Sequence, residues 1–293
     1  MTTGGKQMNL FEGLEKFGLK ATGVTSLFEE EKKKVTAEEV TKPSAMEEIP
    51  AEESFLLEKT VRCTVCDKVF KAKMVKSGRA KRMEPDEDLR PKYEHIDILK
   101  YDVSSCPNCG YTAMNRYFEH LSSAQIKLIK EQVCANFKPS GGSEPATYDY
   151  ETAIGRYKLA LYTTMVKKAR TSEKAYCCLK LAWLYRGMAE SLDSNDPATE
   201  TTRKECKQQE EMFYQQAYEG FMKAVSSEMF PICGMDQNTM DYLLAYMSAH
   251  FKQYSTASKC LANILQSSVA SSKIKDRARD LKEKIVAELK QGK

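Results

Sequence analysis

Cysteine is the residue type whose number and spacing point most directly to chemistry in this sequence. Ten cysteines occur in 293 residues, and the first four form two Cys-x-x-Cys pairs, Cys63 with Cys66 and Cys106 with Cys109. Two thiolates three positions apart can bind one metal ion from a single turn, and two such pairs complete the closed tetrahedral set typical of structural zinc. We therefore predict a structural Zn²⁺ at these four cysteines.

The two pairs are further apart than in a usual zinc ribbon. Thirty-nine residues separate Cys66 from Cys106, whereas ribbons commonly place about 15–20 residues there. We expect residues 76–100 to form an inserted loop or hairpin. Two unrelated pairs or a redox dithiol are the alternatives to a metal site. His95 and His120 could substitute as ligands, although four cysteines already suffice.

A cluster of six cations between the two pairs is a second candidate site. No acidic residue interrupts it, and such a cluster could contact RNA or another anion by neutralising phosphates. An acidic run at residues 84–88 follows directly, so a solvated loop balanced by its neighbours is the competing interpretation. The cations are Lys71, Lys73, Lys76, Arg79, Lys81 and Arg82.

The thiol of Cys233, in the segment FPICGMD, is a third candidate. Asp236 is suited to cap a helix, which would place Cys233 just ahead of a helix N-terminus, where the pKa of a thiol can fall. A reactive thiol and a buried loop thiol both fit this position. The sequence contains no P-loop, dinucleotide-binding fingerprint, nucleophile elbow or H-E-x-x-H motif. Enzymatic activity is therefore the less favoured interpretation.

The metal ligands lie in a segment with the features of a small β-rich module. Residues 55–121 contain short β-compatible runs, separated by turn residues, with no sustained helical period. A module of this size builds little core alone, so metal binding would contribute to its folding. Residues 1–54 form a separate N-terminal segment. It has a short amphipathic stretch within residues 1–28 and then an acidic linker with nine glutamates between residues 29 and 53.

Residues 122–293 have the pattern of a helical domain. Ser122 and Gln125 have the spacing of a capping box at the start of the first helix, which should run to about residue 137. Pro139, Gly141 and Pro145 then interrupt the helical pattern. Six further helices are expected near residues 149–170, 172–191, 200–229, 237–251, 254–267 and 272–290.

Several of these helices share a pattern of large and small residues. Tyr150, Ala153, Tyr157 and Ala160 have the spacing of the second helix of a tetratricopeptide repeat, and the pattern recurs from Tyr214 and more loosely from residue 254. The predicted fold is therefore mainly α: a TPR-like helical array preceded by a small β-rich, zinc-ribbon-like module. A generic helical bundle is the alternative.

The composition describes a folded chain rather than a disordered or membrane-spanning one. Hydrophobic residues make up 42% and charged residues 29% of the sequence, and the net charge of +4 is too small to require a nucleic-acid partner. No run of about 20 apolar residues could cross a membrane, and no secretory signal is present. We predict a cytoplasmic protein without membrane insertion, whose thiols stay reduced.

Over roughly residues 55–290 the chain resembles a bacterial family known as domain of unknown function 2225. The resemblance implies a cytoplasmic bacterial protein in which Cys63, Cys66, Cys106 and Cys109 form a zinc site, followed by TPR-like helices. It also implies that the Cys233 loop is a family feature, and it supplies no activity. The segments that carry it are CTVCDKVFKAK, LRPKYEHIDILKYDV, CPNCGYTAMNRYF, AIGRYKLAL, SEKAYCCLKLAWLYRG and FPICGMD.

These observations favour a non-catalytic scaffold that binds a protein or peptide in a groove of its helical array. Two alternatives remain open. The first is a nucleic-acid-associated regulator that uses the basic loop 71–82 and the basic C-terminal helix. The second is a thiol-based redox protein that uses Cys233.

Overall fold

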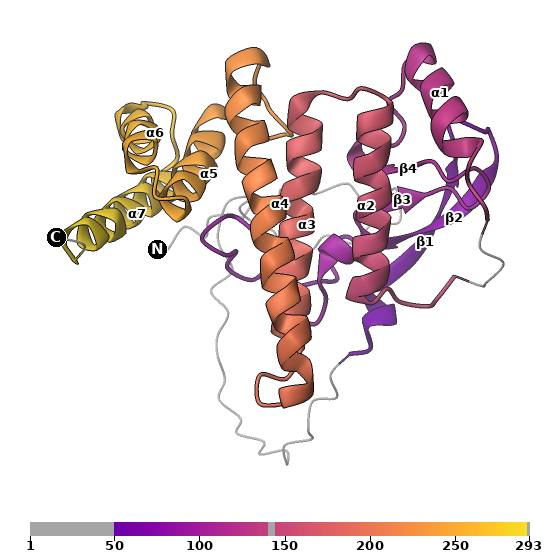
Figure 1. Cartoon of the computed structure of the whole chain (residues 1–293), viewed down its shortest axis with the longest axis horizontal. Coiled ribbons are helices and arrows are strands. Elements are labelled where there is room, and N and C mark those ends of the chain that lie inside the picture. Colours follow the sequence, from indigo (N-terminus) through magenta and orange to yellow (C-terminus); the bar gives the residue numbers. More distant parts are fainter. Residues whose placement is uncertain (1–49, 140–143, 292–293) are drawn as a thin grey trace, which may run out of the picture. The chain divides into compact units, whose positions relative to one another are not determined.

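The fold is mainly α, with a small β module near its N-terminal end, as the sequence predicts (Figure 1). The computed structural model describes residues 50–139 and 144–291. The amphipathic stretch within residues 1–28 and most of the acidic linker lie outside the described residues. Within them, no helix has the length and apolar character needed to span a bilayer.

Two short antiparallel hairpins form the β module. In the first, Leu56 pairs with Val75 at one end and Arg62 with Val69 at the other; in the second, Val103 pairs with Met114. Each hairpin therefore has a Cys-x-x-Cys pair in the turn between its strands. The strands are β1 (Leu56–Arg62), β2 (Val69–Val75), β3 (Val103–Ser105) and β4 (Thr112–Met114).

Seven α-helices in the described residues follow the predicted ranges closely. Ser122 and Gln125 form the predicted capping box, and the side chain of Asp236 caps the fifth helix. The first helix is shorter than predicted because it passes into a π-helical turn at Lys130–Cys134. The helices are α1 (Ser123–Ile129), α2 (Tyr150–Val166), α3 (Thr171–Ser191), α4 (Glu200–Ser227), α5 (Gln237–His250), α6 (Tyr254–Gln266) and α7 (Ser272–Gln291).

From α2 onward, each helix packs against the next one along the chain, and α7 also contacts α5. Small residues make close packing of α3 and α4 feasible: a Cβ at Gly220 of α4 would lie 2.7 Å from the Cβ of Ala175 in α3. The alanines and most of the large residues of the pattern are buried. They include Ala153, Tyr157, Ala160, Tyr214, Ala217, Phe221, Ala224, Ala257, Leu261 and Ile264.

The β module shares its packing with the helices. Leu99, Val103 and Met114 belong to the same buried cluster as the cores of α2 to α7, and β4 packs directly against α2. A second buried cluster surrounds the cysteine pairs and takes in Val166 of α2. The predicted division of the chain at residues 54 and 121 stays a prediction.

Candidate metal centre

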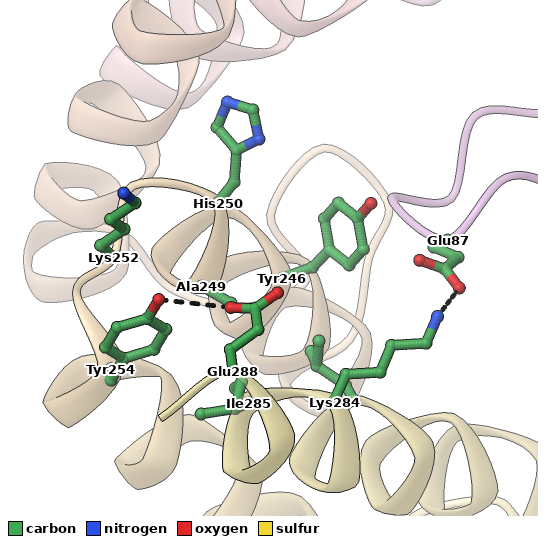
Figure 2. A pocket seen from close by; sticks show the side chains of 10 residues that line it. Glu87, Tyr246, Ala249, His250, Lys252, Tyr254, Lys284, Ile285 and Glu288 are labelled. Carbon is green, nitrogen blue, oxygen red and sulfur yellow. Dashed lines mark hydrogen bonds and ion pairs between the residues drawn. The ribbon is translucent and has the colours of Figure 1, made fainter. Parts of the chain in front are cut away.

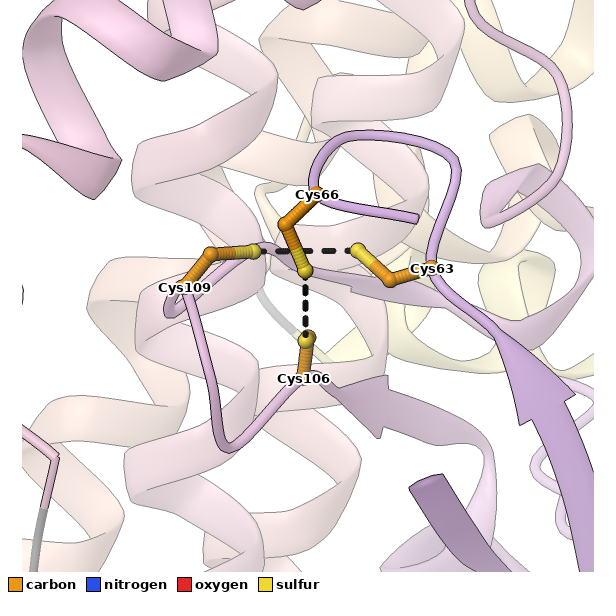
Figure 3. Close-up of side chains that lie close together, drawn as sticks. All are labelled: Cys63, Cys66, Cys106 and Cys109. Atoms are coloured by element: carbon orange, nitrogen blue, oxygen red, sulfur yellow. Dashed lines mark hydrogen bonds between the residues drawn. The ribbon is translucent and has the colours of Figure 1, made fainter. Parts of the chain in front are cut away.

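The four paired cysteines meet at one point between the two hairpins (Figure 3). All four sulfur atoms lie within 4.8 Å of one another. The Sγ atoms of Cys63 and Cys109 are 3.7 Å apart, and those of Cys66 and Cys106 are 3.6 Å apart. Each hairpin thus supplies two thiols to a single group of four, which is an arrangement that could hold a metal ion.

The two cysteine pairs lie in turns with the same hydrogen-bond pattern. In each turn, the amide of the residue after the second cysteine donates to the carbonyl of the first cysteine: Asp67 to Cys63, and Gly110 to Cys106. Asp67 and Gly110 both have left-handed backbones, with φ of 63° and 76°. Only glycine fits at the second position, because a Cβ there would collide with the ring of Phe137.

The ionisation of the four thiols is strongly linked. A hydrogen bond with Cys106 raises the pKa of Cys63 to about 12 and also raises that of Cys109, whereas the pKa of Cys106 is lowered through its bond with Cys109. Ionisation of one thiol thus opposes ionisation of its neighbours. A divalent cation would balance these negative charges, so the donor set fits a thiophilic metal. Four cysteine ligands leave no position open for a substrate.

Apolar side chains surround the four cysteines and shield them from water. Tyr111 is fully buried, and its hydroxyl donates to the carbonyl of Phe118 at 3.0 Å. The Thr64 hydroxyl donates to the same carbonyl at 3.3 Å and ties the first turn to this cluster. The other buried members include Val61, Val65, Phe70, Ala113, Ile129, Val133 and Val166. The four sulfur atoms therefore lie at the centre of a small hydrophobic core.

A fifth cysteine, Cys134, packs beside the four at the end of the π-helical turn. Burial raises the pKa of this half-buried thiol. Nothing in the sequence indicates this proximity, because Cys134 has no partner at metal-ligand spacing. The two histidines that could have substituted as ligands are not in the group of four: His95 pairs with Glu94 at 3.7 Å, and His120 is exposed.

The six basic residues of the second candidate site lie on β2 and in the turn after it, where most make contacts within the chain. Lys71 donates to the Thr60 hydroxyl, Lys76 to the carbonyl of Ser54, and Arg79 lies over the Phe55 ring. Lys73 is 3.8 Å from Glu58 and Lys81 is 3.4 Å from Glu94, while residue 82 makes a β-bridge with Tyr93. An anion contact at these residues stays a prediction.

Cys233 lies in a tight turn ahead of α5 and is 8% exposed. Its backbone is left-handed, its thiol donates to the carbonyl of Ser172 at 3.3 Å, and its own carbonyl accepts from Arg116. Burial raises the pKa of this thiol above its usual value. The environment thus favours the protonated thiol over the thiolate. Because the thiolate is the nucleophilic form, Cys233 fits the interpretation of a buried loop thiol better than that of a reactive one.

We expect Cys233 to resist alkylation in the folded protein. Its raised pKa leaves less thiolate at neutral pH than a free cysteine has, and burial limits access. Native protein treated with iodoacetamide at about pH 7.5 and digested should show Cys233 modified only after unfolding. Reaction of native Cys233 at the rate of a free cysteine at this pH would restore the redox alternative.

The inserted segment between the cysteine pairs does not stand apart from the helices. Asp88 is 1% exposed; its carboxylate accepts from the indole nitrogen of Trp183 at 2.8 Å and pairs with Arg186 at 2.8 Å. Arg90, also buried, bridges Asp86 and Glu190. We call Asp86, Asp88, Arg90, Trp183, Arg186 and Glu190 the clamp. It fastens the insertion to α3.

The clamp was not predictable from sequence, since it joins residues 95 positions apart. The structure places Trp183 in the core, with its polar atom satisfied by the insertion. The only signal in the sequence was the presence of a single tryptophan together with several acids in a loop. Neither indicates which residues pair.

Comparison with known proteins gives one match. A family described as "Uncharacterized protein conserved in bacteria (DUF2225)" matches residues 56–285. No curated protein and no solved structure matches the chain. The matched region contains all four cysteines of the metal centre, the clamp and the helices from α1 to most of α7.

Proposed function

Because the chain belongs to the bacterial family DUF2225, whose description assigns no activity, we propose a function from the site itself: a non-catalytic protein-interaction scaffold with a structural zinc centre. Zinc is the metal that best suits four cysteine ligands in a closed, tetrahedral set. The apolar surroundings and the knuckle-like turns support a role in folding rather than in catalysis. We further propose that the protein is cytoplasmic, where its cysteines would stay reduced.

The observation that carries the interaction function is an open hollow of about 640 Å³ beside the last three helices (Figure 2). Tyr246 of α5 and Tyr254 of α6 line it, and Leu281 and Ile285 of α7 form its apolar floor. A hydrogen bond joins Tyr254 to Glu288, and an ion pair joins Lys284 to Glu87. Aromatic, apolar and charged groups combined in this way are typical of surfaces that bind peptides.

The order of the helices supports the TPR-like interpretation. Sequential packing from α2 to α7, with small residues at the contacts, is how helical repeats build a curved array. In such arrays each unit contacts mainly its neighbours, and the grooves between units are where partners bind.

A nucleic-acid function is less well supported. Acidic groups lie among the cations of α7: Glu84 pairs with Lys273 and Arg277, and Asp276 pairs with Arg279. A row of phosphates would meet these carboxylates as well as the cations. Most cations after β2 also have partners within the chain, as described above.

We expect specific protein partners to co-purify with the tagged full-length protein from its own cytosol, and nuclease treatment to leave them bound. Charge reversal at the rim of the hollow, Lys252→Glu with Glu288→Lys, should remove them. The matched control is Lys259→Glu, an exposed α6 residue that does not line the hollow. Partners that nuclease removes would favour the nucleic-acid alternative. If the rim variant still binds the same partners, the hollow is not their binding site.

A further inference from the structure

Three hollows follow one another along α7 and share lining residues. The 640 Å³ hollow shares Tyr246 and Lys284 with a neighbour of about 260 Å³, which in turn shares Arg277 with a third of about 490 Å³. The acidic loop 84–87 of the insertion lines all three. We call this row of adjoining hollows, lined by α5, α7 and the acidic loop, the α7 groove.

The acidic loop makes buried contacts on one side and solvent-exposed ion pairs on the other. On the inner side, Asp88 and Arg90 are buried in the clamp. On the side of the groove, Glu84 pairs with Lys273 at 3.2 Å and with Arg277, and Glu87 pairs with Lys284. These glutamates are 67% and 55% exposed, whereas Arg277 is only 16% exposed; ion pairs whose carboxylate faces water contribute little to stability. The carboxylates are thus placed on α7 by the clamp but are only weakly bound there.

The groove offers more than cations to a ligand. Leu281 and Ile285 form an apolar floor, and Tyr246 and Tyr254 stand beside it. Lys252, at the turn between α5 and α6, makes no ion pair with any described residue. A ligand that reached from Lys284 to Lys252 would find a cation at each end, with the side chain of Ile285 and the carboxylate of Glu288 between them (Figure 2).

We propose that the α7 groove binds an acidic peptide segment of a partner protein, and that Glu84 and Glu87 act as built-in competitors for the same cations. This inference rests on the interaction function and specifies the chemistry of its partner. The carboxylates of the loop already show that side chains of this type fit against Lys273, Arg277 and Lys284. A partner carboxylate would displace them, while an apolar side chain of the partner would pack on Leu281 and Ile285.

The lining favours a peptide over a nucleic acid. Asp280 and Glu288 face the groove beside the cations, and a continuous row of phosphates would be repelled at both positions. A peptide can place its few carboxylates at the cations and leave uncharged residues beside these acids. The apolar floor also suits a side chain better than a phosphate backbone.

The test uses full-length protein and a fluorescein-labelled peptide with the sequence of residues 83–89, MEPDEDL, measured by fluorescence anisotropy. Removing the competitors with Glu84→Gln and Glu87→Gln should tighten binding on the order of tenfold, because it frees the three cations that these glutamates pair with. Adding Lys273→Gln, Arg277→Gln and Lys284→Gln should abolish it. Binding should also weaken as salt is raised.

Controls separate this effect from general changes of charge. Glu58→Gln with Glu200→Gln removes two exposed carboxylates that form ion pairs elsewhere and should leave peptide affinity unchanged. The amide peptide MQPNQNL should not bind. Equal affinity of the wild type and the Glu84/Glu87 variant would overturn the proposal, and so would tighter binding of a labelled oligouridylate than of the acidic peptide. If partners co-purify while the peptide test fails, the interaction function stands and only this inference falls.

Discussion

Cys106→Ser is expected to abolish metal binding and to destabilise the β module strongly. A serine hydroxyl is a poor replacement for a thiolate ligand, and the three remaining cysteines would leave the metal coordination incomplete. Metal-binding free energy is folding free energy in small metal-stabilised modules, so the cost should reach at least about 3–5 kcal/mol. Elemental analysis would measure the metal, and urea unfolding would measure stability.

The matched control for this variant is Cys134→Ser. This thiol lies beside the centre but outside the group of four, so the variant should keep its metal and most of its stability. The helical far-UV signal of Cys106→Ser should be largely retained, because the cluster that spans α2 to α7 contains none of the four ligands. Metal retained at full stoichiometry in Cys106→Ser would contradict the assignment of the centre.

Asp88→Ala should lower the free energy of unfolding by about 2–3 kcal/mol, because it leaves the buried indole N–H of Trp183 without its acceptor and removes one of the carboxylates that pair with the mostly buried guanidinium of Arg186. Burial alone would lower the pKa of Arg186, but the charges of Asp88 and Glu210 raise it. The native pairing therefore outweighs the cost of burying the cation. Denaturant unfolding of the purified variant, followed by tryptophan fluorescence, would report the change directly, since Trp183 lies at the site.

Two comparisons identify the cause of this loss. Asp88→Asn keeps an oxygen for the indole N–H but removes the charge, so it should fall between the wild type and the alanine variant. Glu94→Gln removes an exposed ion pair with Lys81 and should change stability by less than about 1 kcal/mol. If Asp88→Ala were as mild as Glu94→Gln, the clamp would not hold the insertion in solution.

The helices were predictable because their signals are local. The capping box at Ser122, the N-cap at Asp236 and the periodic burial of each helix face all act over a few residues. The end of α1 was not predicted correctly, because no residue near Lys130 signals a π-helical turn.

The candidate site was predictable for the same reason, and its surroundings were not. Each cysteine pair carries its own spacing, so the four thiols could be named before their positions were known. The nearness of Cys134 and the pairing of Asp88 with Trp183 depend on how distant segments pack. Nothing in the local sequence encodes those contacts. The insertion was expected as a loop, but its attachment to α3 and the position of its acids along α7 appear only in the folded chain.

The insertion begins after Cys66 and returns to the centre at Cys106, so its two ends are tied together wherever those thiols share a metal ion. Such a tie closes a loop and removes much of the conformational freedom that the intervening chain would otherwise have. That same loop carries Glu84 and Glu87, which line the groove beside α7. Binding of the metal ion would then be thermodynamically linked to the fraction of molecules in which Glu84 and Glu87 cover the groove. A chain that lost its ion would hold its acidic side chains over α7 at a greater entropic cost, and would present a more accessible groove.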